Sequence, residues 1–407
     1  MAASVLFYVQ HLLGIGHLRR ALRIVDALAG EGIEVTLVSG GEPLSSQSRP
    51  SAEHFVQLEP IRSRDTQFKD LVDASGRPIN DTLRQMRQTS LLAAFAAARP
   101  DAVVIEAFPF GRRAFRFELD PLIDAVASSR PPPLLICSLR DIVVAPKDPK
   151  RLREIVDRVR ADFDFVFVHG DPAFIPLEAS FPLAREITDR LIYTGYVSDT
   201  SEPTRADAVF LTDEVAGTDE VLVSVGGGAV GGALLATALE ARQRGCLAAN
   251  RWRLLAGPNL PQMEFDVLAD RLPQGVVLER YRRDFPQMLR RCRVSVSQAG
   301  YNTVLDILAA RSAAVVVPFS ADHESEQSLR AETLAARGIV ELVRETELSP
   351  ERLSLAIDHA IAHGPRGIAI NTEGARRTAT LIAAAIRSSA SDTACCVGNW
   401  CSGGLSI

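Results

Sequence analysis

The sequence predicts an α/β protein made of two tandem Rossmann-like domains, each with a doubly wound parallel sheet. Three observations lead to this fold class. Short β-branched and aromatic runs alternate with helical patterns through most of the 407 residues, which is typical of parallel sheets. A polar, turn-rich stretch at 199–219 interrupts the alternation, and the same pattern then starts again. A chain of this length is also long enough for two domains, each with its own core.

Short apolar runs mark the strands of the first half of the chain. We expect strands at 5–9, 33–39, 101–106, 134–139 and 163–170. Apolar residues at helical spacing predict a helix over 18–30 and a second helix that ends before Arg99. Residues 42–80 are polar, and we expect irregular structure there until that second helix begins.

The second half of the chain repeats this pattern. We expect strands at 221–226, 251–257, 275–280, 293–298 and 313–318, with a helix over 232–244 after the first of them. The predicted organisation is an N-terminal domain (1–198), a linker (199–219), a C-terminal domain (220–365), a terminal helix that packs back (366–388) and a disordered tail (389–407). The two sheets are expected to face each other across a cleft, because ligands of such sheets bind beyond the carboxyl ends of the strands.

The composition is that of a globular protein, with 47% apolar and 23% charged residues. Acidic residues (50) outnumber Lys and Arg (45), which disfavours binding of nucleic acid by phosphate neutralisation. The six cysteines show no zinc spacing, so we expect no metal. No leader pattern is present, and no apolar run approaches the roughly 18 residues of a membrane span. We expect a cytoplasmic protein, either free or in peripheral contact with the inner face of the membrane.

A glycine-flanked histidine follows the first predicted strand, in the segment QHLLGIGHLRRA (10–21). Gly14 and Gly16 allow a tight turn, and His17 falls at a helix start, where a lowered pKa keeps an imidazole neutral at pH 7. Arg19 stands where the dinucleotide-binding pattern needs its third glycine, and no acidic residue ends the second strand, so NAD is disfavoured. The alternative for His17 is a helix-capping histidine without chemistry.

A second glycine-rich turn follows the strand at 221–226. A glycine loop before a helix can bind any phosphate, and a hydroxyl nearby can add a hydrogen-bond donor. The alternative is a plain strand-to-helix turn. The candidate donor-binding residues of this turn are Ser224, Gly226, Gly227 and Gly228.

The segment 295–334 places polar residues at the ends of two consecutive predicted strands. The first strand ends at Gln298, and Gly300 allows a tight turn into a helix whose free N–H groups can receive a diphosphate. These N–H groups belong to Tyr301, Asn302 and Thr303.

One turn further along that helix, Asp306 can accept hydrogen bonds from both hydroxyls of a ribose. The loop after the next strand carries His323, Glu326 and Gln327, where a sugar can lie. Each of these residues alone is more simply a solvated loop residue. Their joint placement at consecutive strand ends favours a binding site.

Glu106 ends its predicted strand just before AFPFGRR (107–113), so we expect it to reach the same edge of the sheet. Arg112 and Arg113 are candidate acceptor-binding residues, because guanidinium groups suit an anionic acceptor. The alternative is that both arginines are simply solvated.

These motifs resemble the GT-B glycosyltransferases, and glycosyltransferase family 28 in particular. The resemblance covers 220–345 well and rests on the glycine-flanked histidine in the first half. It implies a UDP-sugar donor on the C-terminal domain and an acceptor on the N-terminal domain. Gly300 and Thr303 match the diphosphate-binding helix start, and Asp306 matches the ribose carboxylate, where the family usually carries glutamate.

The resemblance also assigns roles to two further groups of residues. Glu326 and Gln327 match the pair that touches the donor sugar, and the backbone from Arg280 through Tyr281 to Arg282 would hold the base. The chain is also similar to a nucleotide-sugar hydrolase of the pseudaminic acid pathway. In that case the glycine-flanked histidine activates water, and Arg19 or Arg20 supplies the arginine of the motif.

We therefore expect a metal-independent inverting glycosyltransferase without a cofactor, which moves a hexosyl or N-acetylhexosaminyl group from a UDP-sugar to an acceptor that the sequence does not identify. His17 is the expected general base, and Glu106 is the alternative base. Two other functions remain open, a nucleotide-sugar hydrolase and a non-catalytic UDP-sugar-binding protein.

Overall fold

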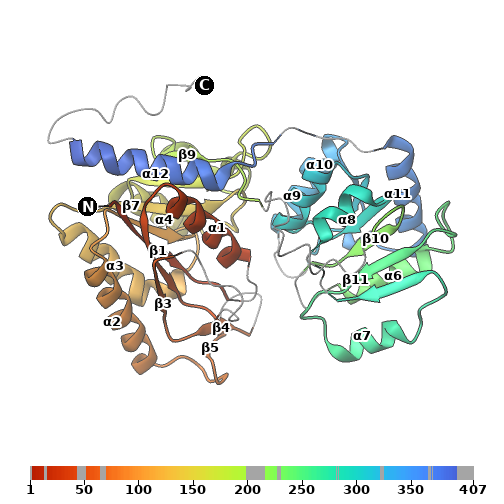
Figure 1. The fold of residues 1–407 in the computed structure, drawn as a ribbon, viewed down its shortest axis with the longest axis horizontal. Helices are drawn as coiled ribbons and strands as arrows, with labels where there is room; N and C mark the ends of the chain where they lie inside the picture. Colours follow the sequence, from red (N-terminus) through yellow and green to blue (C-terminus); the bar gives the residue numbers. More distant parts are fainter. Residues whose placement is uncertain are drawn as a thin grey trace. The chain divides into compact units, whose positions relative to one another are not determined.

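The chain divides into two compact units in a computed structural model (Figure 1). Unit 1 comprises residues 1–197 and 371–407, and unit 2 comprises residues 198–370. The structure describes residues 2–12, 16–43, 52–64, 70–198, 216–226, 231–280, 282, 284–320, 325–364, 368 and 370–391. Most of the predicted linker and residues 392–407 of the predicted tail lie outside these residues.

A seven-stranded sheet forms the centre of unit 1, in the order β3-β2-β1-β6-β7-β8-β9. All of its neighbouring strands are parallel, as the apolar runs predict. The strand order reverses between β1 and β6, and a ligand-binding crevice typically forms at such a reversal, beyond the carboxyl ends of the strands. The strands are β1 (Ser4–Val9), β2 (Glu34–Ser39), β3 (His54–Gln57), β6 (Ala102–Glu106), β7 (Leu134–Arg140), β8 (Phe165–His169) and β9 (Leu191–Tyr193).

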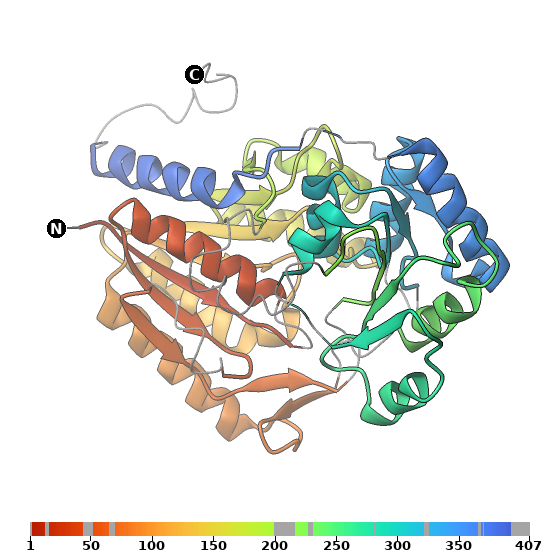
Figure 2. The same ribbon diagram turned by 45° about the vertical axis from the view of Figure 1, so that its right-hand side comes forward.

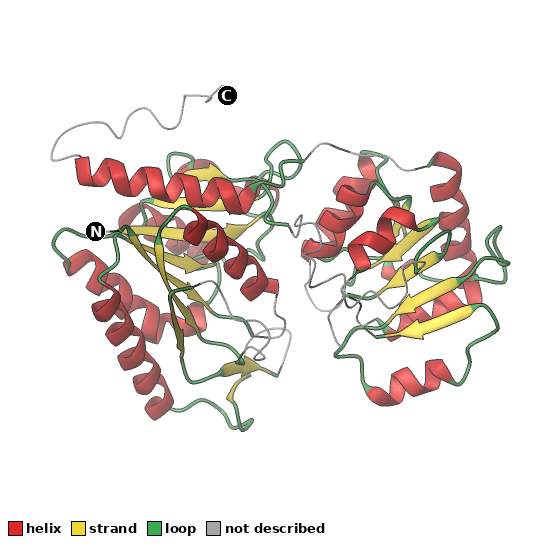
Figure 3. Cartoon of the chain, in the orientation of Figure 1, coloured by secondary structure: helices red, strands yellow, loops and turns green. Residues whose placement is uncertain are grey.

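Helices cover both faces of this sheet (Figure 3). α1 and α12 pack against each other and share one core with the sheet, whereas the buried residues of α2, α3 and α4 belong to the core on the other face. In α1, Leu18, Ala21, Val25 and Leu28 recur at helical spacing and are buried, which explains why this segment forms an amphipathic helix. The helices are α1 (Gly16–Gly30), α2 (Asp81–Ala98), α3 (Arg116–Ser128), α4 (Pro149–Asp162) and α12 (Gly374–Ser391).

Three differences from the predicted elements occur in unit 1. Residues 42–80, expected to be irregular, contain β3 and an antiparallel pair formed by β4 (Ile61–Ser63) and β5 (Leu71–Asp73). β9 was not expected either. These strands have only three or four residues, which is too short for an alternation or an apolar run to stand out from the surrounding sequence. The terminal helix starts at Gly374 and ends at Ser391, a shift from 366–388.

The chain returns to unit 1 through a close backbone crossing before α12. The Tyr196 amide donates to the carbonyl of Asn371 at 2.6 Å, and the Gly374 amide donates to the carbonyl of Tyr196 at 3.0 Å. A Cβ on Gly374 would collide with the carbonyl oxygen of Gly195. Only glycine allows this approach, which brings α12 onto α1.

Unit 2 contains a six-stranded parallel sheet in the order β12-β11-β10-β13-β14-β15, and Figure 2 shows these strands side by side. Its strand order also reverses, between β10 and β13. The strands are β10 (Val221–Ser224), β11 (Trp252–Leu255), β12 (Val276–Glu279), β13 (Val294–Ser297), β14 (Ala314–Val316) and β15 (Glu341–Leu342). The predicted class of parallel α/β units is thereby confirmed.

The helices of unit 2 pack in two groups. α6 and α11 contact each other and share the core that includes Val221, Val223 and Val294, while α8 and α9 pack together outside that core. The helices are α6 (Gly232–Ala241), α7 (Gln262–Ala269), α8 (Phe285–Arg291), α9 (Tyr301–Ala310), α10 (Ser325–Ala336) and α11 (Pro350–His363). Among the helices of the described residues, none is both long and apolar enough to cross a membrane.

Candidate active site

A buried ion cluster lies in unit 1 where β1 and β6 end. His17 is in the first turn of α1, and Glu106 is the last residue of β6. His17 Nδ1 lies 2.5 Å from Glu106 Oε1, and Arg20 Nη2 lies 2.5 Å from the same oxygen. Because residues three apart share one side of a helix, α1 presents His17 and Arg20 to the carboxylate together.

The contact with Glu106 fixes the tautomer of His17. An ionised carboxylate can only accept, so Nδ1 carries the proton and Nε2 is left as the basic nitrogen. Burial lowers the pKa of His17 to about 4, while Glu106 acts in the opposite direction and the charges of Arg112 and Arg20 add to the lowering. The imidazole is therefore neutral at pH 7. The sequence predicted this from the helix start, but burial is the larger cause.

Glu106 is ionised although it is 1% exposed. Burial on its own would raise the pKa of Glu106, but His17, Arg20 and Arg112 together hold that pKa well below its ordinary value. A carboxylate with so low a pKa is a poor proton acceptor at neutral pH. It is well suited to orient the imidazole and to stabilise an imidazolium.

Only one of the two predicted acceptor-binding arginines belongs to this cluster. Arg112 Nη2 lies 3.8 Å from Glu106 Oε2, whereas Arg113 is half exposed and donates to Glu154 at 3.2 Å. Arg112 has a left-handed backbone conformation with φ 60°, and it is followed directly by a short helical turn, Arg113–Phe115. This change of direction separates the two neighbouring side chains.

The structure also distinguishes the two arginines of the GHLRR motif. Arg20 is buried against Glu106, whereas Arg19 is exposed. His11, at the end of β1, is buried as well, and its pKa is lowered chiefly by burial. Gly16 begins α1, and Gly14 lies outside the described residues.

In unit 2 the predicted donor residues meet at the ends of β10 and β13. Ser224 and Ser297 are paired in register as the last residues of these parallel strands, and Gln298 follows. Gly300 is the N-cap of α9 and has no side chain to cap the helix. The start of a helix whose N-cap residue has no side chain is a typical place for a phosphate to bind.

The spacing along α9 places three predicted residues on one side of the helix. Asn302 and Thr303 lie in the first turn. Asp306 is four residues after Asn302 and three residues after Thr303, which is the spacing of neighbours on one side of a helix. Asn302 is exposed, and Thr303 and Asp306 are half-buried. A ligand at the start of α9 therefore has hydroxyl, amide and carboxylate groups within one helical turn.

Glu326 and Gln327 have structural partners that the sequence did not predict. The Gln327 side-chain oxygen accepts from the Ala299 amide at 3.1 Å and from the Phe319 amide at 3.2 Å, so it joins the turns after β13 and β14. Glu326 Oε1 accepts from Arg330 Nη2 at 2.9 Å. These oxygens hold the loops of the site together.

Arg330 is a residue that the sequence analysis missed. It is 1% exposed, its Nη1 donates to the Ala299 carbonyl at 3.0 Å, and its guanidinium lies 5.6 Å from the centre of the Tyr301 ring. It thus supports the turn that leads into α9. The signal in the sequence is its position four residues after Glu326 on α10, which favours an ion pair along the helix.

The Arg280 side chain contacts residues of unit 2. Its Nη1 donates to the carbonyls of Gly257, Pro258 and Leu260 at 3.1–3.3 Å, and its guanidinium lies 4.5 Å from the centre of the Phe265 ring. It therefore holds the loop after β11 in place.

The glycine-rich segment after β10 is described only as far as Gly226, which has φ 67°. Gly227, Gly228, Tyr281 and His323 lie outside the described residues.

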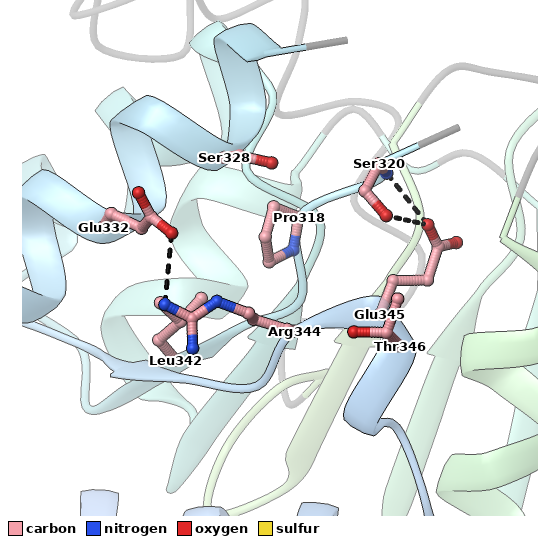
Figure 4. A pocket seen from close by; sticks show the side chains of 8 residues that line it. All are labelled: Pro318, Ser320, Ser328, Glu332, Leu342, Arg344, Glu345 and Thr346. Carbon is pink, nitrogen blue, oxygen red and sulfur yellow. Dashed lines mark hydrogen bonds and ion pairs between the residues drawn. The ribbon is translucent and has the colours of Figure 1, made fainter. Parts of the chain in front are cut away.

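A small cavity of about 220 Å³ lies beside α10 in unit 2 (Figure 4). Ser320 Oγ donates to Glu345 at 2.9 Å on one side of it, and Arg344 donates to Glu332 at 3.2 Å on the other. Its lining includes none of the predicted donor residues.

In the described part of the chain, no three His, Cys, Asp or Glu side chains are grouped as metal ligands would be.

Comparison with known proteins connects unit 2 to a family. Residues 222–386 match the family model of the glycosyltransferase family 28 C-terminal domain. The UDP-N-acetylglucosamine–N-acetylmuramyl-(pentapeptide) pyrophosphoryl-undecaprenol N-acetylglucosamine transferase of Alkaliphilus oremlandii is 30% identical over 182 residues, which are 43% of this chain and 48% of that protein. The enzyme of the same name from Brucella anthropi is 36% identical over 78 residues, 19% and 21% of the two chains. The chain thus spans half or less of these relatives.

Solved structures match over nearly the whole chain. The calicheamicin glycosyltransferase CalG4 has a TM-score of 0.57 at 17% identity and covers 96% of this chain and 95% of its own. MurG of Acinetobacter baumannii has a TM-score of 0.55 at 14% identity, with coverage of 94% and 99%. At these identities the likeness shows the fold. The chain therefore has the GT-B fold, and its residues 222–386 are similar to the C-terminal domain of glycosyltransferase family 28.

Proposed function

We propose that this protein is a glycosyltransferase that moves a hexosyl or N-acetylhexosaminyl group from a UDP-sugar to an acceptor hydroxyl, with inversion and without a metal. The observation that carries the proposal is the partly buried His17–Glu106 pair at the strand reversal of unit 1, in a chain whose residues 222–386 match the family 28 C-terminal domain model. The names of its relatives specify UDP-N-acetylglucosamine as donor, which supports a UDP-sugar.

His17 is the proposed general base. The acceptor oxygen attacks the anomeric carbon of the donor, the bond from that carbon to the diphosphate oxygen breaks, and its electron pair leaves with UDP. The acceptor proton passes to His17 Nε2, and Glu106 stabilises the imidazolium through Nδ1–H. The low pKa of Glu106 favours His17 over Glu106 as the base.

The donor is proposed to bind at the ends of β10 and β13. The N–H groups at the start of α9 receive the diphosphate, where the helix dipole stabilises the charge that develops on the leaving group. This stabilisation is our reason for proposing a reaction without a metal. Asp306 is proposed to hold the ribose, Glu326 and Gln327 to border the sugar, and the backbone near Arg280 to contact the base.

The acceptor is proposed to bind on unit 1, beside Arg112. The printed names of the relatives include a pyrophosphoryl-undecaprenol, a lipid-linked acceptor, so we also propose that the protein works in the cytoplasm and contacts the membrane surface. Water is the alternative acceptor, because the same histidine can deprotonate it. An assay without added acceptor separates hydrolysis from transfer, since only hydrolysis then releases UDP.

Thermal unfolding of the full chain with UDP, dTDP, GDP or NAD tests the donor assignment. A ligand at one hundred times its Kd adds roughly 2.7 kcal/mol to the free energy of unfolding. At about 2–4 °C per kcal/mol, the midpoint should rise by several degrees with UDP or dTDP. A rise with NAD alone, or with none of the four, would contradict the proposal.

A further inference from the structure

Three buried polar atoms beside the His17–Glu106 pair have no hydrogen-bond partner among the described residues. They are His11 Nδ1, Glu106 Oε2 and Arg112 Nε. His11 is 5% exposed, and the side chains of Glu106 and Arg112 are 1% and 9% exposed. Leaving such a buried group unpaired costs about 1–3 kcal/mol. Three of them together indicate a place where a polar ligand binds.

These three side chains lie around one point of unit 1. Arg112 Nη2 is 3.8 Å from Glu106 Oε2, too far for a hydrogen bond. His11 follows the end of β1 by two residues, and Glu106 ends the neighbouring strand β6, so both residues lie at the same edge of the sheet. A Cβ on Gly41 would collide with that ring, so the glycine after β2 makes room for it. We call His11, Glu106 and Arg112 the acceptor cradle.

The unpaired donor and acceptor atoms of the acceptor cradle define which polar groups a ligand must offer. The Nε of Arg112 can only donate, and an ionised Glu106 can only accept. The buried Nδ1 of His11 has no partner among the described residues, and a neutral imidazole can accept a hydrogen bond there when its proton is on Nε2. The matching ligand therefore offers one accepting oxygen and two donating hydroxyl groups.

The charges around the cradle favour a negatively charged ligand. Burial lowers the pKa of Arg112, and the neighbouring guanidinium groups of Arg140 and Arg20 add to this effect, against the opposing charge of Glu106. Arg112 Nε is a buried donor on a positively charged group, and an anionic oxygen is the acceptor that best offsets the burial of that charge.

The loop that carries Arg112 is built into the core. Phe108 and Phe110 are buried, and their rings contact Phe163 at 6.5 Å and Phe181 at 5.1 Å between ring centres. Arg112 is consequently held beside Glu106 before any ligand arrives, which reduces the entropy lost on binding.

We propose that the acceptor cradle binds a hydroxylated anion, so that the acceptor carries a phosphate or carboxylate group close to the hydroxyl that is glycosylated. Arg112 donates to the anionic oxygen, and Glu106 Oε2 and His11 Nδ1 accept from hydroxyl groups. This inference rests on the proposed function and adds to it the chemical class of the acceptor.

The first test titrates the full chain with inorganic phosphate and with acetate by calorimetry, in the presence of saturating UDP. UDP occupies the proposed diphosphate site in unit 2, so an anion that still binds reports on another site. We expect wild type to bind one of the two anions and Arg112→Gln to bind it at least about 10-fold more weakly. Preference for phosphate or for acetate distinguishes the two acceptor classes.

The controls separate failure of this inference from failure of the proposed function. Arg153→Gln changes an exposed arginine on α4 that pairs with Glu186, and it should bind the anion as wild type does. Arg112→Lys keeps the charge and should retain part of the affinity, which guards against a folding defect in Arg112→Gln. Absence of anion binding to wild type, or unchanged binding by Arg112→Gln, overturns the inference. Absence of UDP binding in the same experiment contradicts the proposed function instead.

The second test concerns the hydroxyl groups. Glycerol 3-phosphate should bind the UDP-saturated wild type more tightly than inorganic phosphate, because it adds two hydroxyl donors. His11→Leu should reduce this advantage, because one of the two groups that accept from hydroxyls is then missing. An equal advantage in His11→Leu, or none in wild type, would show that the cradle does not recognise hydroxyl groups.

Discussion

Replacing His17 by alanine should abolish most of the transfer activity and leave donor binding intact. A positioned base contributes about 10²–10⁴-fold, which equals roughly 2.7–5.4 kcal/mol at about 1.36 kcal/mol per factor of ten. We expect the lower part of this range, because a pKa of about 4 makes His17 a weak base at neutral pH. The variant should fold, since Arg20 still pairs with Glu106 at 2.5 Å.

Two measurements on each variant check this prediction. The kcat comes from release of UDP in the presence of an acceptor, and the Kd of UDP comes from calorimetry. Asp26→Ala is the matched control, because Asp26 is exposed on the same helix. His17→Ala should lower kcat by at least about 10²-fold without changing the Kd.

The pH dependence gives an independent check. Protonation of His17 removes the free electron pair on Nε2, so wild-type activity should fall below a pH of about 4, the pKa of His17, and stay level above it until other groups titrate.

In the His17→Ala variant, a kcat loss below 10-fold would exclude His17 as the base. Equal losses in kcat and in UDP affinity would instead make it a phosphate-binding residue.

Three further predictions concern the donor site and acid stability. Asp306→Ala should weaken UDP binding by roughly 10–100-fold in calorimetry while Asp270→Ala, an exposed acid on unit 2, should not; unchanged affinity would remove the ribose assignment. Arg330→Ala should raise the KM for the UDP-sugar more than it lowers kcat and should cost about 3–5 kcal/mol in urea unfolding, because Glu326 loses its buried partner. Arg330→Lys should restore part of the KM, whereas a purely structural role would change stability and leave the KM as it is. Finally, the unfolded chain protonates His17 near its ordinary pKa of 6.5 and the folded chain only near 4, so the free energy of unfolding should fall as the pH drops from 6.5 to 4. His17→Gln should remove about 3 kcal/mol of this fall in urea titrations at several pH values, and an unchanged slope would contradict the lowered pKa.

The sheets were predictable where strands are buried on both faces. β1 and β6 are continuous apolar runs because helices cover both of their sides, and such runs are visible in sequence. β3 and β9 lie at the edges of the sheet, and their residues are partly exposed. Edge strands of three or four residues are too short to show a clear period, so the sequence did not indicate them.

The two members of the His17–Glu106 pair were each predicted, but their contact was not. They are 89 residues apart in sequence, and they meet because β1 pairs with β2 on one side and with the distant β6 on the other. This pairing is a property of the whole sheet. Local patterns can place a residue at a strand end, but they do not determine which strand ends are neighbours.

Arg112 and Arg113 show a second limit of sequence patterns. The two residues are identical in type and adjacent, and the sequence offered no reason to separate them. The positive φ of Arg112 and the helical turn that follows direct one guanidinium toward Glu106 and the other toward Glu154. Such a choice depends on how Phe108 and Phe110 fix the loop in the core, which a local pattern does not contain.

Gln327 shows why a motif match alone does not establish a contact with substrate. The resemblance to family 28 implies that it touches the donor sugar, yet its side-chain oxygen accepts from two backbone amides, at 3.1 and 3.2 Å. A residue can be required in a family because it holds two loops in the geometry that the donor needs. Replacement of Gln327 would then disturb UDP-sugar binding without any loss of a direct contact. Kinetic loss in such a variant is therefore weaker evidence for sugar recognition than a structure with the donor bound.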